Sequence, residues 1–169
     1  MSDTAQAGRA RIPRWRILVL GQKRSNRDGI AALVHGQPDL VCCGTVTADK
    51  AGAVVARENP DLLVIEAAVQ QGDALDLANS LHLQFPYLRM LILSEDEDAA
   101  YAERALQLGA RGCVLQTEPP VEVLTAIRTV LNDKIFLSHN LSVGLLQRML
   151  KPGSCAEPQD RKTGGRLNP

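Results

Sequence analysis

The feature that most constrains the fold of this chain is the alternation of short apolar runs with longer segments whose apolar residues recur at helical spacing. Most of the short runs are continuously apolar, as strands that are covered on both faces require. Strands are predicted at residues 16–20, 40–43, 62–65, 89–93 and 112–115. Five β–α units in succession predict an α/β fold, a doubly wound, five-stranded parallel sheet with helices on both faces.

The helical segments carry apolar residues on predicted inner faces. These faces are Ile30/Leu33/Val34, Ala53/Val54/Ala56, Leu75/Ala78/Leu81, Ala102/Ala105/Leu106 and Val123/Leu124/Ile127/Leu131. Ser25 with Asp28 indicates a capping box, Asp96–Asp98 place negative charge at a helix N-terminus, and Gly109 can end that helix in the left-handed conformation. A sixth helical pattern, from Leu141 to Leu150, follows Ser138 as its expected cap and lies beyond the five units.

Charge divides the 169 residues into segments, although 19 basic side chains balance 19 acidic ones. Residues 1–16 have a net charge of +3, residues 17–150 of −5, and residues 151–169 of +2. Gly, Pro and Ser are also concentrated at both ends. We therefore expect a flexible basic tail at 1–15, one domain at 16–133, an additional C-terminal helix at 134–150 and a flexible linker at 151–169.

Composition excludes several classes of protein. Five aromatic residues are too few for base-stacking nucleic-acid recognition. The four cysteines form no CxxC pair and no histidine is spaced to complete a zinc site, so we expect reduced thiols and no metal. Apolar stretches of about five residues are far short of the roughly 20 that cross a bilayer, and the N-terminus lacks a signal peptide. A cytoplasmic protein without membrane contact is expected.

Ligands of an open parallel sheet collect at the carboxyl ends of its strands. The residues predicted there are Gly21, Gln22, Glu66, Ser94 and Gln116. They include no general base, no cation and no second carboxylate, which predicts no enzyme, no cofactor and no metal.

Residues 17–150 resemble the receiver domain of bacterial response regulators, in particular the NarL/LuxR class. Ile17-Leu-Val-Leu with Arg27-Asp-Gly-Ile-Ala-Ala-Leu is similar to the first strand and helix of the family, and Pro60-Asp-Leu-Leu-Val-Ile-Glu66 to its third strand. Leu91-Ile-Leu-Ser94, the run Tyr101-Ala-Glu-Arg-Ala-Leu-Gln-Leu-Gly-Ala-Arg-Gly112, and Ile135-Phe-Leu-Ser138 complete the resemblance. It implies a flavodoxin-like sheet with strand order 2-1-3-4-5, acting in two-component signal transduction.

The chain departs from this family at the phosphorylation site. A working receiver uses an acidic pair, a phospho-accepting Asp, a Ser or Thr and a Lys, which together hold Mg²⁺ and the phosphoryl group. The matching positions here are Gly21 and Gln22 (lost acidic pair), Glu66 (degenerate acceptor), Ser94 (retained switch hydroxyl) and Gln116 (lost lysine). We therefore expect an atypical receiver that is not phosphorylated in the usual way.

Two side chains keep alternative interpretations. The Glu66 carboxylate either mimics phospho-aspartate and bonds to Ser94, or points at solvent, Lys23 or Arg24. Tyr101 is either the switch aromatic of the family or an amphipathic side chain half-buried at the rim.

Receivers of this class act through dimerisation to control an attached helix-turn-helix domain, and residues 161–169 resemble the linker to such a domain. The resemblance thus implies a transcriptional regulator that contacts DNA only through a domain outside these residues. A homodimer through the last helices is expected, with Gly144 allowing close helix approach, unless the final helix folds back on its own domain.

Two alternatives remain open, a stand-alone protein-interaction module and a second-messenger sensor. Phe136-Leu137-Ser138-His139 is similar at three positions to a cyclic di-GMP motif but has His139 where that motif has Arg, so binding of a small molecule is uncertain.

Overall fold

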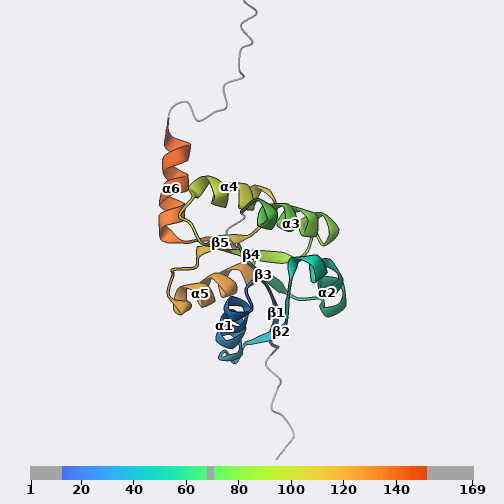
Figure 1. Cartoon of the computed structure of the whole chain (residues 1–169). Coiled ribbons are helices and arrows are strands. Elements are labelled where there is room, and N and C mark those ends of the chain that lie inside the picture. Colours follow the sequence, from blue (N-terminus) through green and yellow to red (C-terminus); the bar gives the residue numbers. More distant parts are fainter. Residues whose placement is uncertain (1–12, 68–70, 152–169) are drawn as a thin grey trace, which may run out of the picture.

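The computed structural model describes residues 13–67 and 71–151, which form a parallel sheet between two layers of helices (Figure 1). The strands are β1 (Trp15–Leu20), β2 (Leu40–Val46), β3 (Leu62–Glu66), β4 (Arg89–Ser94), β5 (Gly112–Leu115) and β6 (Phe136–Leu137). The helices are α1 (Arg24–His35), the 3-10 turn η1 (Ala48–Lys50), α2 (Ala51–Glu58), α3 (Gln71–Gln84), α4 (Ala99–Gln107), α5 (Pro120–Leu131) and α6 (His139–Leu150). The expected tail at 1–12 and linker at 152–169 lie outside the described residues.

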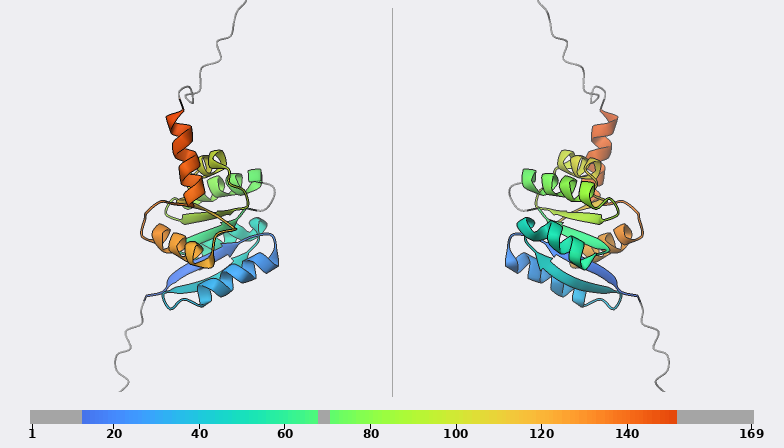
Figure 2. Two further views of the ribbon diagram at one scale, coloured as in Figure 1. Left: turned by 90° about the vertical axis from the view of Figure 1, so that its left-hand side faces the viewer. Right: turned by 90° about the vertical axis from the view of Figure 1, so that its right-hand side faces the viewer.

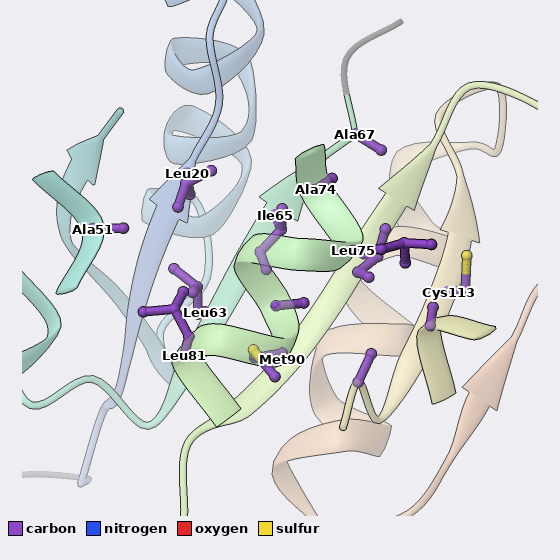
Figure 3. Packing of buried hydrophobic residues seen from close by; sticks show 14 of the residues in the cluster. Leu20, Ala51, Leu63, Ile65, Ala67, Ala74, Leu75, Leu81, Met90 and Cys113 are labelled. Atoms are coloured by element: carbon purple, nitrogen blue, oxygen red, sulfur yellow. The ribbon is translucent and has the colours of Figure 1, made fainter. Parts of the chain in front are cut away.

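Two apolar clusters fill the spaces between the sheet and its helices. Successive side chains of a strand point to opposite faces, so Leu18 and Leu20 join the cluster under α2, α3 and α4, while Ile17 and Val19 join the one under α1 and α5. Figure 3 shows part of the first cluster, with Leu63 and Met90 packed against Leu81 of α3. Both faces of the sheet are covered, which explains why the strands are continuously apolar rather than alternating.

The sheet has six strands in the order β2-β1-β3-β4-β5-β6, with every neighbouring pair parallel. The predicted fold and the order 2-1-3-4-5 are confirmed, and the predicted number of five strands is corrected to six. β6 pairs Phe136 with Gly112 and Leu137 with Cys113. Two residues are too short a run for periodicity to detect, and they form a strand only because α5 returns the chain to the free edge of β5. The segment 134–150 therefore holds a strand as well as the expected helix.

The ends of α1 and α4 test the predicted caps. The capping box is wrong, because α1 begins at Arg24 after the extended residue Lys23, which places Ser25 within the first turn, and there is no side-chain cap. The role of Asp98 is confirmed, since its Oδ1 accepts hydrogen bonds from the backbone N–H groups of Ala100 (2.9 Å) and Tyr101 (3.3 Å). Gly109 is left-handed as predicted, with φ of 107°.

Helical spacing identified the buried face of α5 but not that of α2. Val123, Leu124, Ile127 and Leu131 are all buried, as predicted. In α2 the fully buried residues are Ala51 and Val55. Of the predicted residues, Val54 is partly buried against the same cluster, whereas Ala53 and Ala56 are exposed. Apolar residues surround nearly all of this eight-residue helix, so spacing alone cannot select one face.

α6 folds back onto α4 of its own domain and extends beyond it at its C-terminal end (Figure 2). Leu141 is buried in the cluster under α4, and an added Cβ at Gly144 would lie 3.0 Å from Ala99 Cβ. Asn140 donates a hydrogen bond to Glu97 (2.7 Å), and Arg148 forms an ion pair with Glu103 (3.3 Å). One side of α6 is thus used within the domain, as one of the two predictions for this helix stated.

In the described part of the chain, no helix combines the length and the apolar character that crossing a membrane requires.

Candidate functional site

The carboxyl ends of β1, β3, β4 and β5 meet at one edge of the sheet and place Gly21, Glu66, Ser94 and Gln116 there. Gln116 occupies the lost lysine position. Its Nε2 atom lies 3.5 Å from the carbonyl oxygen of Ala67 and 3.4 Å from that of Leu93, so the neutral amide contacts backbone rather than presenting a charge. Gln22 is exposed beside Gly21. The edge therefore has the residues that the sequence predicted, but their contacts depend on side-chain packing.

Glu66 is buried, with 5% of its surface exposed. Its Oε1 atom accepts a short hydrogen bond from Asn26 Nδ2 in the first turn of α1, and its Oε2 atom is buried without a hydrogen-bond partner. The predicted orientation toward solvent, Lys23 or Arg24 is therefore wrong.

The predicted bond between Glu66 and Ser94 is also absent from the described structure. Ser94 Oγ instead donates to the carbonyl oxygen of Asp96 (3.0 Å) and accepts from its N–H (3.3 Å). The hydroxyl forms its hydrogen bonds within the local turn after β4. Glu66 therefore does not bond to Ser94 in the way expected of a phosphoryl group.

Gly21 explains how Glu66 can be buried. A Cβ atom added at Gly21 would lie 2.4 Å from Glu66 Oε2, closer than real Cβ contacts allow, and 3.0 Å from Arg27 Cγ, which is tight; the flexible end of Glu66 would have to move. The carboxylate thus occupies the space in which a side chain at position 21 would stand. The glycine after β1 and the acid at the end of β3 thus fit one another, and we call this packing the Gly21–Glu66 contact.

The residues at this edge do not fit the Mg²⁺ ion that working receivers hold. A hard divalent cation takes six or more oxygen ligands, usually including several carboxylates, whereas positions 21 and 22 provide no carboxylate. Within residues 13–67 and 71–151, no group of three or more His, Cys, Asp or Glu side chains is placed to hold a metal ion.

A cavity of about 570 Å³ opens beside Glu66, between the N-terminal parts of α1 and α5. It is lined by Ser25, Asn26, Gly29, Ile30, Leu33, Glu66, Leu93, Gln116, Glu118, Pro120 and Val123. The sequence had not singled out Asn26 or Glu118. Their position in the sequence could have identified them, because a helix or loop that follows a strand begins at the carboxyl edge of the sheet, where the site lies.

Tyr101 and the cysteines lie inside the domain. Tyr101 is 5% exposed in the cluster under α4, which rules out the predicted rim position, and its hydroxyl is buried without a partner. Burial raises the pKa of Tyr101 and that of Cys113 to about 12. Burial also raises the pKa of the half-buried thiols of Cys42 and Cys43, so all three described cysteines stay protonated and unreactive at neutral pH. Cys155 lies outside the described residues.

The segment Phe136-Leu137-Ser138-His139 forms β6 and the start of α6. Phe136 packs against the cluster under α1 and α5, whereas His139 is exposed. Ser138 stands at the expected N-cap position without capping α6, because its buried Oγ accepts a hydrogen bond from the backbone N–H of Leu115 (3.0 Å). This hydroxyl joins the end of β5 to the new strand, a role that spacing could not indicate.

Comparison with known proteins identifies the domain. The family model described as the response regulator receiver domain matches residues 17–128. The oxygen regulatory protein NreC of Staphylococcus haemolyticus is 26% identical over 126 residues, which cover 73% of this chain and 58% of that protein. The chain thus spans less than two thirds of that relative's length.

Solved structures share the fold. A LuxR-family two-component response regulator from Aurantimonas sp. SI85-9A1 has a TM-score of 0.76 at 19% identity, covering 82% of this chain and 99% of that one. A structure of two RcsB dimers bound to two parallel DNAs has a TM-score of 0.68 at 17% identity, covering 79% and 68%. The family model includes well over half of the residues, and the strand order is that of the fold, so the chain belongs to the response regulator receiver domain family.

Proposed function

We propose that this domain is the regulatory part of a transcriptional regulator and that it works without phosphorylation of Glu66. The observation that carries the proposal is the Gly21–Glu66 contact, in which the carboxylate at the acceptor position fills the space where a side chain at position 21, the first of the expected acidic pair, would stand. Incoming phosphoryl groups would meet a buried carboxylate, and the described residues that line the adjacent cavity include no cation.

The size of the expected defect follows from electrostatics. Phosphoryl transfer depends on positive charge around the transferred group, and removal of one preorganised stabilising group typically costs about 10²–10³-fold in rate. Here the acidic pair that would hold the metal ion is Gly21 and Gln22, and the lysine is Gln116, so two such losses coincide.

Incubation of the full chain with acetyl phosphate and Mg²⁺, followed by intact mass measurement, tests this part of the proposal. We expect no mass shift under conditions in which a conventional receiver, treated in parallel, is phosphorylated. A stoichiometric, acid-labile shift that disappears in Glu66→Ala would contradict the proposal.

Dimerisation is the proposed output. The side of α6 that faces away from α4 carries Leu146, Met149 and Leu150, which are 58%, 70% and 81% exposed. With the partly exposed Val143 they lie three or four positions apart and form an apolar stripe, which favours pairing with the same stripe of a second copy. The similar RcsB structure contains dimers on DNA, which supports this kind of assembly.

Light scattering on the full chain tests the dimer. Leu146→Glu combined with Met149→Glu places two charges on the stripe without touching the packed side of α6, and we expect the mass to fall from that of a dimer to that of a monomer. Gln147→Glu, an exposed position on the same helix, is the matched control and should leave the dimer intact. A wild-type monomer at all concentrations would contradict the proposal.

DNA contact, in this proposal, belongs to a domain outside these residues. This part of the proposal is supported by the length of NreC, because the matched region covers only 58% of that protein. The reading frame after Pro169 tests it, since a helix-turn-helix there is expected and a stop codon would favour a stand-alone interaction module.

A further inference from the structure

We propose that the cavity between α1 and α5 binds a small organic cation, an amine or amidine group on an apolar body, with Glu66 as its counter-ion. This inference goes beyond the proposed function, which needs neither a ligand nor this cavity. A ligand here would give the domain an input at the edge where its relatives receive a phosphoryl group.

The dimensions and walls of the cavity suit a small molecule. Its volume of about 570 Å³ lies within the 300–1,000 Å³ typical of ligand sites. Ile30 and Leu33 of α1 and Val123 of α5 form an apolar lining, while Glu66, Asn26 and Gln116 supply polar groups near the strand ends. Such a lining binds an apolar body along the helices and orients a polar head toward the sheet.

The charges around the cavity select a cation. Glu66 and Glu118 are the carboxylates among the described lining residues, and those residues include no Lys, Arg or His. A phosphate or carboxylate ligand would be repelled by both acids and would meet no positive partner. A positively charged head group would be attracted by both.

Glu66 itself has unused capacity to accept a hydrogen bond. A carboxylate can accept about four hydrogen bonds, and the described structure provides one, from Asn26 to Oε1, while Oε2 is buried with none. Arg27, whose Cγ atom also lies near the Cβ position of Gly21, forms no ion pair with Glu66 among the described residues, and its buried Nε atom has no hydrogen-bond partner. Buried acceptors are rarely left unsatisfied, and because Glu66 lines the cavity, rotation of its carboxylate toward the cavity would let an N–H donor of a ligand complete this group.

Gly29 offers a way to close the cavity without harming the fold. It lines the cavity from α1, and a Cβ atom built there meets no heavy atom within 4 Å. Gly29→Leu therefore adds a side chain at the cavity while Glu66 stays unchanged, which separates loss of binding from loss of the carboxylate.

The test titrates the full chain with three probes of similar shape, 2-phenylethylamine, 2-phenylethanol and 3-phenylpropionate, and follows backbone amide chemical shifts. We expect saturable shifts at cavity residues such as Asn26, Leu93 and Gln116 with the amine, and weaker or no binding with the alcohol and the acid. Because a charged hydrogen bond is involved, Glu66→Gln should weaken amine binding about tenfold or more. Gly29→Leu should abolish it.

Asp28→Asn is the matched control. Like Glu66→Gln it removes one negative charge, but Asp28 is exposed on α1 and does not line the cavity, so amine binding should be unchanged. The inference is overturned if the amine does not bind, if the acid binds as tightly as the amine, or if Glu66→Gln and Asp28→Asn bind the amine equally. None of these outcomes depends on phosphorylation or dimerisation, so a failure here leaves the proposed function standing.

Discussion

Two glycines at opposite edges of the sheet are both packed against a polar side chain, yet for different reasons. A Cβ added at Gly21, after β1, would lie 2.4 Å from Glu66 Oε2, and one added at Gly109, before β5, would lie 2.4 Å from His82 Cγ. Gly109 also has a positive φ of 107°, whereas Gly21 does not. Gly109 is therefore required by its own backbone, while Gly21 is required only by the length of the side chain opposite. Gly109 is a requirement of the backbone conformation, whereas Gly21 matches one particular side chain, the carboxylate at position 66.

The largest expected effect comes from Gly109→Ala. Both the unfavourable φ and the overlap with His82 oppose it, so the free energy of unfolding should fall by about 3–4 kcal/mol. Denaturant unfolding measures this loss. His82→Ala in the same chain removes the overlap but not the backbone strain and should restore only part of it, whereas complete restoration would show that the two glycines are equivalent.

Gly21→Asp should be the next most harmful change. The new carboxylate would overlap with and repel that of Glu66, lowering the free energy of unfolding by about 2–3 kcal/mol at neutral pH. Glu66→Asp added to it shortens the opposing side chain and should recover at least about 1 kcal/mol of the loss, a positive coupling in a double-mutant cycle. Strictly additive effects would mean that the Gly21–Glu66 contact does not connect the two positions.

Gly29→Ala extends the comparison to a glycine with open space around it. No heavy atom lies within 4 Å of the built Cβ, and its φ is not in the positive range, so only helix propensity acts. Thermal and denaturant unfolding should show a gain of about 0.5–1 kcal/mol in the free energy of unfolding. A fall in the free energy of unfolding would contradict the open space around Gly29.

Gly144→Ala should have the smallest effect. The gain in helix propensity of up to about 1 kcal/mol is opposed by the approach to Ala99 Cβ at 3.0 Å, so the net change should stay within about 0.5 kcal/mol. Gly144→Val serves as the sharper variant, because a branched side chain must push α6 from α4. Faster hydrogen exchange in α6 with an otherwise intact domain is expected, and unchanged exchange would contradict the packing of these helices.

Much of the fold could be predicted because strands buried on both faces leave a strong pattern. The runs at 16–20, 62–65 and 112–115 became β1, β3 and β5 within one residue at either end. Patterns failed where residues were few or uniformly apolar. β6 has two residues, and the apolar residues of α2 surround nearly the whole helix. In both cases, packing against neighbouring elements decided what spacing left open.

The sequence by itself determined which residues stand at the site, because chain order places strand ends at one edge of a parallel sheet. Through the resemblance to receivers, it also predicted that Gly21, Gln22 and Gln116 stand where a working receiver has its carboxylates and lysine. Only the tertiary structure decided where Glu66 points, since that depends on the space left by a glycine 45 residues earlier and on Asn26 of α1. Distant residues share one small volume there, and no local pattern in the sequence records such a fit.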